Sequence, residues 1–485
     1  RFHAAAPRKP WRGRLDAKSF GDACIFESKA RGVARMSEDC LFMNIWTPSS
    51  SATWPLPVII FIHGGGFMMG SGAEPRFWGD LFVDGASPVV YVTFDYRMGI
   101  LGFYSGEAGA NFGVQDQQLA LRFVHDNIAG FGGDSDRVTL LGQSAGAMSV
   151  QTHLVAPGSR GLFARAILAS TVGLHYRSLK QNKPFVDSAA RAVGCLGLLR
   201  NQTACMREMN AEALDAAAIS SAYAFHLHTG CQACDNFLPW LPVVDGKIVP
   251  RAPLDMLRSG DHAKVPVIIS SVRNESWAFF PGILQEAASS KLGYTLLMKA
   301  LFRDKASVVQ QHYAQSPDAR GMNRTVRFAL AMSDALFTCY ARYIAKIMSA
   351  SSPIFLSHFM HAPSHRADPF NSAVDGTCEN GVTCHAADLG WIFPYSRLMQ
   401  STTGLRYAHR EFDFALTYSE AIRAFAHGKN TSQWKPYSRA LDQSLLWEVE
   451  STRVTTGYHR EHCNFFERMG FPATAWDVRL STVWI

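Results

Sequence analysis

The sequence predicts an α/β fold with a mostly parallel central sheet and helices on both faces. Two observations lead to this expectation. Short apolar runs rich in β-branched residues recur along the 485 residues, as expected for buried parallel strands. Segments with helical periodicity or many small residues separate these runs, which is the alternation that covers a parallel sheet with helices.

The expected elements follow in chain order. The strands are expected at residues 57–63, 89–94, 138–141, 166–169, 265–269 and 354–356. Helices are expected at 116–128, by its apolar spacing, and at about 144–155, where small residues follow a glycine-rich turn. The stretches 175–240 and 277–350 read as helical insertions that form a cap. Because repeats and long linkers are absent from the sequence, we expect residues 1–485 to form a single domain.

Composition and charge exclude several classes of protein. Hydrophobic residues make up 47% of the chain and charged residues 18%, which is typical of a globular protein. The net charge of +7 is spread along the chain and gives no nucleic-acid signature. The sequence contains no apolar run of about 18 residues, so no transmembrane helix is predicted.

Ten cysteines and several glycosylation sequons favour an oxidising compartment. The sequons begin at Asn201, Asn323 and Asn430. Disulfides persist in secreted or periplasmic proteins, whereas free thiols are usual in the cytosol. We therefore expect a secreted protein, or one of the secretory pathway or periplasm, although this chain shows no signal peptide.

Gly142-Gln-Ser144-Ala-Gly146 matches the pattern G-x-S-x-G. A predicted strand precedes it and a small-residue helix follows. A serine on such a sharp turn has its hydroxyl above the sheet, and the flanking glycines avoid clashes. The context predicts that Ser144 is a nucleophile rather than part of a packing turn.

His63-Gly-Gly-Gly-Phe67 follows another predicted strand. Three glycines allow backbone N–H groups to approach a substrate oxygen closely. We expect the amides of Gly65 and Gly66, together with that of Ala145, to form an oxyanion hole. His63 itself is expected to shape the loop rather than to act as a base.

Taken together, these motifs resemble the type-B carboxylesterase and lipase family, which has the α/β-hydrolase fold and includes the cholinesterases. Similar blocks run through nearly the whole chain, and the longest are 131–146, 38–46, 95–103, 113–121 and 159–168. Arg1-Phe2 resembles the middle of an early family block, so the first strands of the family are expected to be absent from this chain.

The resemblance also assigns the acid and the base. A serine needs an imidazole to take its proton and a carboxylate to orient that imidazole. Glu275 follows a predicted strand and is similar to the acid of the family, with Asn274 and Ser276 as departures beside it. His385 is similar to the family base, with Ala386 in place of the usual glycine. Asn274 is also part of a formal sequon and should be buried if Glu275 is catalytic.

By the same resemblance, disulfides are expected at Cys24–Cys40, Cys195–Cys205 and Cys339–Cys463. Cys378 and Cys384 are close enough in the sequence for a local bridge beside His385. The remaining pair, Cys231 and Cys234, lies next to His226 and His228. That spacing permits a zinc site, but a local disulfide or two free thiols are the alternatives, and we expect no metal or cofactor.

The expected activity is hydrolysis of small esters with short to medium acyl chains. Residues 25–39 contain no tryptophan and position 143 is glutamine, so the cation-binding features of cholinesterases are missing. The same short span makes a poor lid, which disfavours a lipase. A lipase and a non-catalytic adhesion or binding homologue remain the alternatives, and the sequence gives neither the natural ester nor the oligomeric state. Activity should fall below roughly pH 6–7, because a histidine base must be neutral.

Overall fold

The computed structural model describes most of the chain. The described residues are 1–26, 35–48, 54–197, 201–229, 238–279, 282–364, 382–395, 400, 406–429 and 434–471.

The described residues form a nine-stranded sheet of order β11-β10-β9-β8-β7-β6-β4-β5-β3. Every neighbouring pair from β10 to β5 is parallel, and only the edge strands β11 and β3 are antiparallel. The strands are β3 (Met43–Trp46), β4 (Leu56–Ile62), β5 (Val90–Phe94), β6 (Gly133–Gln143), β7 (Arg165–Ala169), β8 (Val267–Val272), β9 (Ile354–Phe359), β10 (Gln443–Trp447) and β11 (Arg453–Thr456). A separate parallel pair consists of β1 (Ala23–Cys24) and β2 (Met36–Ser37).

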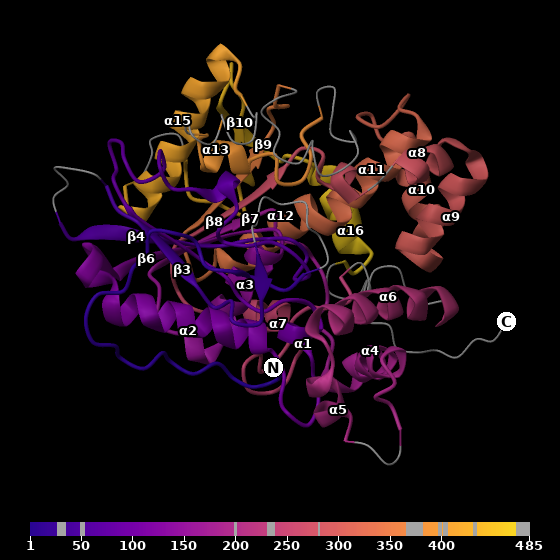
Figure 1. Ribbon diagram of the computed structural model, residues 1–485. Helices are drawn as coiled ribbons and strands as arrows, with labels where there is room; N and C mark the ends of the chain where they lie inside the picture. Colours follow the sequence, from indigo (N-terminus) through magenta and orange to yellow (C-terminus); the bar gives the residue numbers. More distant parts are fainter. Residues whose placement is uncertain are drawn as a thin grey trace.

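Helices cover both faces of this sheet, as Figure 1 shows for α2 below it and α15 above it. The helices are α1 (Gly99–Phe103), α2 (Phe112–Asn127), α3 (Ala145–Val155), α4 (Leu179–Ala192), α5 (Gln202–Glu208), α6 (Ala211–Thr229), α7 (Pro253–Arg258), α8 (Gly282–Ser289), α9 (Lys291–Phe302), α10 (Ala306–Gln315), α11 (Arg324–Ser333), α12 (Cys339–Met348), α13 (Leu389–Ile392), α15 (His409–Ala426) and α16 (Arg460–Arg468). Shorter helical turns are η1 (Pro75–Phe77), η2 (Ile128–Phe131), η3 (Pro157–Ser159), η4 (Glu275–Phe279), η5 (Arg303–Lys305) and η6 (Asp334–Thr338), the last of π type.

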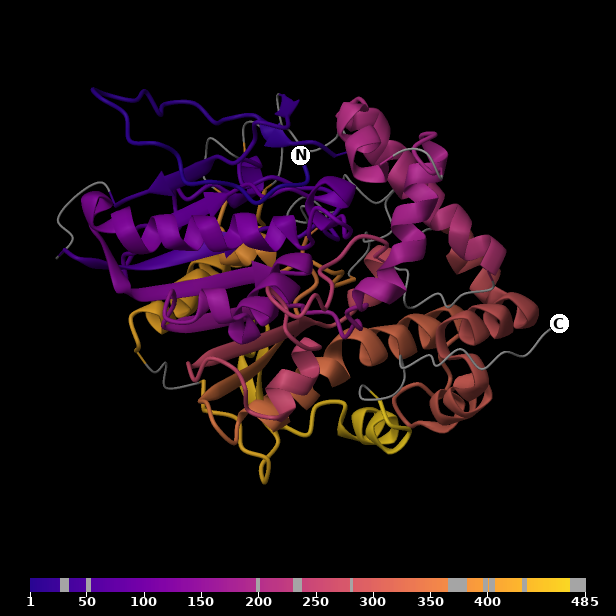
Figure 2. The same ribbon diagram turned by 90° about the horizontal axis from the view of Figure 1, so that it is seen from below.

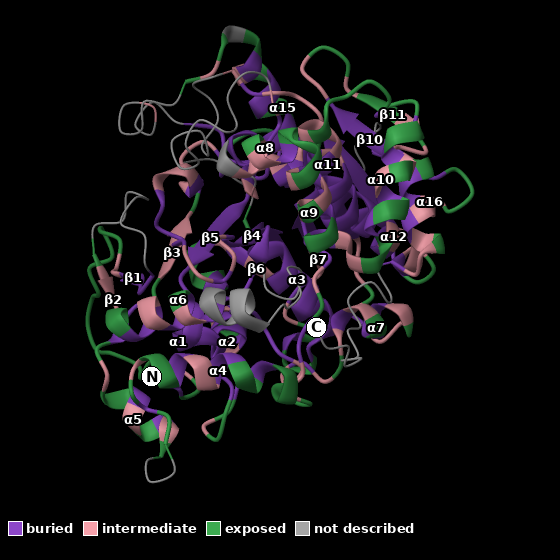
Figure 3. Cartoon of the chain, turned by 90° about the vertical axis from the view of Figure 1, so that its right-hand side faces the viewer, coloured by how far each residue is buried: buried purple, intermediate pink, exposed green. Residues whose placement is uncertain are grey.

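Strand β4 shows why the chain folds into this layered form. All seven of its residues are buried, and their side chains alternate between two hydrophobic cores. Val58 and Ile60 belong to the core beneath α2 and α3, and Ile59 and Phe61 to the core beneath α13 and α15. Figure 3 shows the central strands as buried and the outer helix faces as exposed. The predicted fold class is confirmed.

Two helical insertions interrupt the strand–helix alternation. Helices α4 to α7 lie between β7 and β8, and α8 to α12 lie between β8 and β9. Both insertions leave the carboxyl ends of neighbouring parallel strands, and Figures 1 and 2 show α4 to α6 and α8 to α11 at the right-hand side of the molecule. These positions agree with the helical character expected for 175–240 and 277–350.

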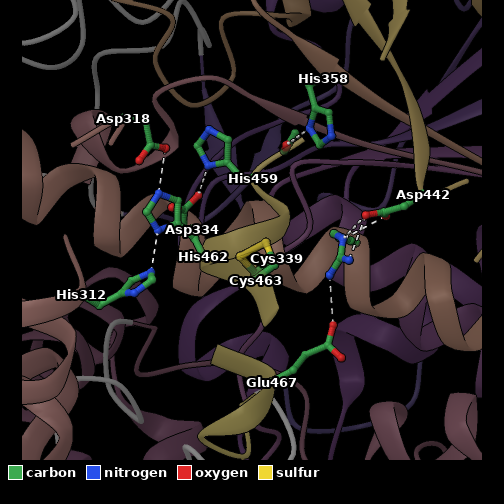
Figure 4. Close-up of a disulfide and its surroundings, with 12 residues drawn as sticks. His312, Asp318, Asp334, Cys339, His358, Asp442, His459, His462, Cys463 and Glu467 are labelled. Atoms are coloured by element: carbon green, nitrogen blue, oxygen red, sulfur yellow. Dashed lines mark hydrogen bonds and ion pairs between the residues drawn. A yellow bond between two sulfur atoms is a disulfide. The ribbon is translucent and has the colours of Figure 1, made fainter. Parts of the chain in front are cut away.

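Three disulfides lie in the described residues, and they are the three that the family resemblance implied. They join Cys24 to Cys40, Cys195 to Cys205 and Cys339 to Cys463. The last one links α12 to α16 (Figure 4).

The other cysteine predictions fall largely outside the described residues. Cys384 is disulfide-bonded, but its partner is not among the described residues. Cys378, Cys231, Cys234 and the side chains of His226 and His228 are also outside them. The local bridge beside His385 and the choice between zinc, a disulfide and free thiols therefore stay predictions. No helix in the described part of the chain is long and apolar enough to cross a membrane.

Candidate active site

The G-x-S-x-G motif forms a tight turn between β6 and α3. Ser144 lies at this turn with φ 59° and ψ −125°, and α3 begins at Ala145. A Cβ atom on Gly142 would collide with the carbonyl of Gly146, and one on Gly146 would collide with the carbonyl of Ile62. The two glycines are therefore needed for the helix to pack directly on the ends of the strands. Ser144 keeps 9% of its surface exposed.

Glu275 and His385, which are 110 residues apart in the sequence, form a buried pair. The Nδ1 atom of His385 lies 2.5 Å from Oε2 of Glu275, and the two side chains are 2% and 0% exposed. The other carboxylate oxygen of Glu275 accepts the backbone N–H of Val272 at 2.8 Å. The carboxylate is thus fixed at the end of β8 and in turn fixes the orientation of the imidazole.

The two loops that carry this pair are joined to each other and to the second insertion. Asn274 donates its backbone N–H to the carbonyl of Thr383 at 3.0 Å, and its side-chain oxygen accepts the Thr383 N–H at 3.3 Å. The hydroxyl of Ser276 donates to the carbonyl of Ala329 at 2.6 Å, and its N–H donates to Ser333 at 3.0 Å. Asn274 is half-buried rather than fully buried as expected.

The other ring nitrogen of His385 faces the nucleophile turn. Its Nε2 atom lies 3.2 Å from Nε2 of Gln143, the residue before Ser144. An amide nitrogen can only donate, so this contact fits a neutral imidazole with its proton on the nitrogen that faces Glu275. Among the described residues, Ser144 makes no hydrogen bond to His385, as is common in unliganded sites.

Aromatic side chains surround the imidazole. The ring centroids of Phe279 and Phe337 lie 4.8 Å and 5.1 Å from that of His385. Phe279 ends η4, which starts at the catalytic-acid candidate, and Phe337 lies in the π-type turn η6. These rings exclude water from the side of the histidine and restrict its rotation.

Ala386 occupies a backbone conformation that favours glycine. Its φ is 68°, in the left-handed region, and its side chain is fully buried. Glycine, the usual residue of the family at this position, adopts this conformation without strain. Alanine in this chain adopts the same conformation with some backbone strain.

The glycine loop after β4 packs against the nucleophile turn. A Cβ atom on Gly64 would lie only 3.0 Å from Cβ of Ser144. Gly65 and Gly66 have φ values of 112° and 65°, which glycine adopts readily. The N–H groups of Gly65, Gly66 and Ala145 donate no hydrogen bond within the described residues. These three amides therefore remain able to bind a substrate oxygen.

His63 lies beneath this loop rather than beside the nucleophile. Its side chain is 1% exposed, and its ring stacks on that of Tyr96 with 4.6 Å between the ring centroids. The Nδ1 atom of His63 donates to the carbonyl of Gly64 at 2.9 Å. This position fits the structural role expected for His63.

Asp388, the other carboxylate near His385 in the sequence, does not contact the imidazole. It is fully buried, and neither of its oxygens has a hydrogen-bond partner in the described part of the chain. Burial raises its pKa to about 7, and the nearby charge of Glu275 adds to the increase. Glu275 is therefore the better candidate for the acid.

Sequence reasoning missed the polar and aromatic contacts around His385. The sequence marks Gln143 only as a departure from cholinesterases, and Phe279 and Phe337 carry no motif. Among the described residues, no group of three or more histidine, cysteine or acidic side chains could hold a metal ion.

Comparison with known proteins decides the family. The Carboxylesterase family model matches residues 1–466, most of the chain. This chain belongs to the carboxylesterase family. Membership makes it a carboxylic-ester hydrolase, and the family resemblance seen in the sequence is confirmed.

Several curated relatives and solved structures agree with this placement. The chain is 31% identical to the cAMP-regulated D2 protein of Dictyostelium discoideum over 444 residues, covering 88% of this chain and 78% of that protein. It is 29% identical to the para-nitrobenzyl esterase of Bacillus subtilis strain 168 over 472 residues, covering 93% of this chain and 88% of that protein. Juvenile hormone esterase of Tribolium castaneum is 37% identical over 309 residues, which span 59% of this chain and 49% of that protein. The structure of a thermophilic PNB esterase superimposes with a TM-score of 0.78 at 25% identity, covering 96% of this chain and 92% of the other.

Proposed function

We propose that this carboxylesterase works by a serine mechanism, with Ser144 as nucleophile, His385 as general base and then acid, and Glu275 as the carboxylate that orients His385. One observation carries the proposal. The buried Glu275–His385 pair directs the second ring nitrogen of His385 at Gln143, the residue that precedes Ser144. Ser144 itself lies on the strained turn that this chemistry needs.

The reaction follows from these positions. The Oγ atom of Ser144 attacks the ester carbonyl carbon while Nε2 of His385 takes its proton. The carbonyl oxygen becomes an oxyanion, which accepts hydrogen bonds from the backbone N–H groups of Gly65, Gly66 and Ala145. The intermediate collapses, the C–O bond to the alcohol breaks, and His385 returns the proton to the leaving alcohol. Water then attacks the acyl-enzyme in the same way and releases the acid.

We further propose that the preferred substrates have short to medium acyl chains. Apolar groups near the reacting atoms are Phe279 and Phe337 beside His385, and Leu238, which lies 3.0 Å from the position of a Cβ on Gly66. These bulky side chains suit a compact acyl group. The three disulfides support an oxidising location, which we propose is extracellular or secretory. The single large sheet supports one catalytic unit.

Hydrolysis of nitrophenyl esters from acetate to palmitate tests the substrate proposal. We expect kcat/KM to peak at or below about eight acyl carbons and to decline toward palmitate. A profile that peaks at palmitate, especially with activation above the solubility limit of the ester, would replace the esterase proposal by a lipase. A folded protein that cleaves none of the esters would instead support the non-catalytic alternative.

A further inference from the structure

A cavity lies beside the loop that carries Glu275. Its volume is about 250 Å³, slightly below the range of about 300–1,000 Å³ typical of small-molecule sites. Arg273 and Asn274, the two residues before Glu275, line it. Neither Ser144 nor His385 lines it, so the cavity is separate from the proposed catalytic centre.

Part of the cavity lining is apolar. Trp277 lines it from η4, and Val326 and Leu330 line it from α11. Val326 and Leu330 are four residues apart, so their side chains lie on one face of the helix. This wall suits a short hydrocarbon chain.

Other residues of the lining present hydrogen-bond donors. The side chain of Arg273 is exposed and makes no hydrogen bond or ion pair within the described residues, although its backbone N–H donates to the carbonyl of Phe359. The hydroxyl of Tyr458 makes no hydrogen bond within the described residues either. Asn274 uses its side-chain oxygen to accept from Thr383, which leaves its amide N–H groups free to donate. These groups together can bind an acceptor such as a carboxylate.

His459 lines the cavity with a fixed orientation. Its Nδ1 atom donates to Oδ1 of the buried Asp334 at 2.6 Å, and its side chain is only 18% exposed (Figure 4). Burial disfavours the charged imidazolium, but the Asp334 carboxylate outweighs burial, and the pKa of His459 lies above its ordinary value of 6.5. The second ring nitrogen of a protonated His459 carries a hydrogen and can donate to a ligand in the cavity.

The acidic residue of the cavity wall is already engaged. Asp318 accepts a hydrogen bond from Nε2 of His462 at 2.8 Å (Figure 4) and another from the hydroxyl of Ser316. Its carboxylate oxygens are therefore already used as acceptors, and the cationic side chain of Arg273 remains to attract an anion.

We propose that this cavity binds a small monocarboxylate with an apolar chain, the chemical class of acid that ester hydrolysis releases. The carboxylate contacts Arg273, Asn274 and His459, and the chain lies against Val326 and Leu330. The site adjoins the loop that carries Glu275, but it does not use Ser144.

Titration calorimetry with sodium octanoate tests the site on the full chain. Arg273→Gln removes the exposed cation, and Val326→Trp fills the apolar part of the cavity. We expect Arg273→Gln to weaken octanoate binding at least tenfold and Val326→Trp to abolish it. Arg320→Gln, at an exposed arginine outside the cavity lining, should bind like the parent protein. Neutral octanol should bind to the parent protein more weakly than octanoate does. Its affinity for Arg273→Gln should equal its affinity for the parent protein.

The outcomes separate the possibilities. Unchanged octanoate affinity in both cavity variants, or no binding to the parent protein, would overturn the proposal. Thermal melting of each variant shows whether it is folded, and Arg273→Gln is expected to fold because its side chain is exposed. The assay measures binding without turnover, so its result does not depend on the role proposed for Ser144.

Discussion

The Nδ1 atom of His385 lies 2.5 Å from the buried carboxylate of Glu275, although a described insertion of several helices separates the two in the chain. This contact explains why the second ring nitrogen of His385 faces the nucleophile turn. The carboxylate holds the imidazole in the tautomer that carries its proton on Nδ1, so that Nε2 can accept the serine proton. Glu275→Gln keeps the shape of the side chain but should no longer select this tautomer.

We expect Glu275→Gln to lower kcat for nitrophenyl butyrate by about 10³–10⁴-fold, as for the equivalent change in other serine hydrolases. Circular dichroism should show an unchanged fold. Glu286→Gln, at an exposed glutamate on α8, is the matched control and should retain full turnover. Turnover within a few-fold of the parent in Glu275→Gln would assign the acid to another residue.

The contact between Gln143 and His385 predicts a charge-dependent pH profile. The amide of Gln143 donates to neutral His385 at 3.2 Å. A carboxylate at this position attracts a proton to the imidazole instead. We therefore expect Gln143→Glu to shift the acidic limb of the kcat/KM profile to higher pH. The Gln143→Met variant lacks both the hydrogen-bond donor and the charge, so the acidic limb of its kcat/KM profile should not shift to higher pH. Identical limbs for Gln143→Glu and the parent would show that the contact does not persist in solution.

Asp388 should destabilise the protein at neutral and alkaline pH. Its folded pKa of about 7 lies above the ordinary value of 3.8, so its contribution to stability is fully present below pH 3.8 and is lost as pH rises through 7. Asp388→Asn removes the buried charge and should raise the free energy of unfolding at pH 8 by roughly 2–4 kcal/mol. At pH 4 the change should be close to zero. Urea unfolding at both pH values checks this, and a destabilised variant at pH 8 would mean that Asp388 has a cationic partner.

The disulfides should differ in how much they stabilise the fold. Cys339–Cys463 closes a loop of 124 residues and Cys195–Cys205 closes one of 10. Loop-closure entropy predicts a loss of about 5 kcal/mol when the first is replaced by two alanines and about 3 kcal/mol for the second. Chemical denaturation of the two double variants measures the difference. Equal losses would show that local strain or packing, rather than loop length, decides the effect.

The sequence predicted the parts of the molecule that depend on local patterns. The strands β4 to β9, the turn at Ser144 and the three disulfides have residue patterns or family blocks that identify them. Strands β3, β10 and β11 were not predicted, and β11 has no apolar run because its residues are mostly exposed. The left-handed conformation of Ala386 was also hidden, since alanine rarely adopts it.

Contacts between distant residues could not be predicted in the same way. Gln143 and His385 are 242 residues apart, and only folding brings them together. The link between Asn274 and Thr383 and the cavity beside it depend on how the second insertion packs on the sheet. Neither has a signature in one sequence.

The most direct measurement is covalent labelling of the esterase with an organophosphate ester, followed by peptide mass spectrometry and by assay of Ser144→Ala. The account predicts one equivalent of label on Ser144, loss of nitrophenyl butyrate hydrolysis in step with labelling, and an inactive but folded Ser144→Ala. Ser307→Ala, at an exposed serine on α10, should be active and label normally. Hydrolysis that survives in Ser144→Ala, or label on another residue, would contradict the proposed mechanism.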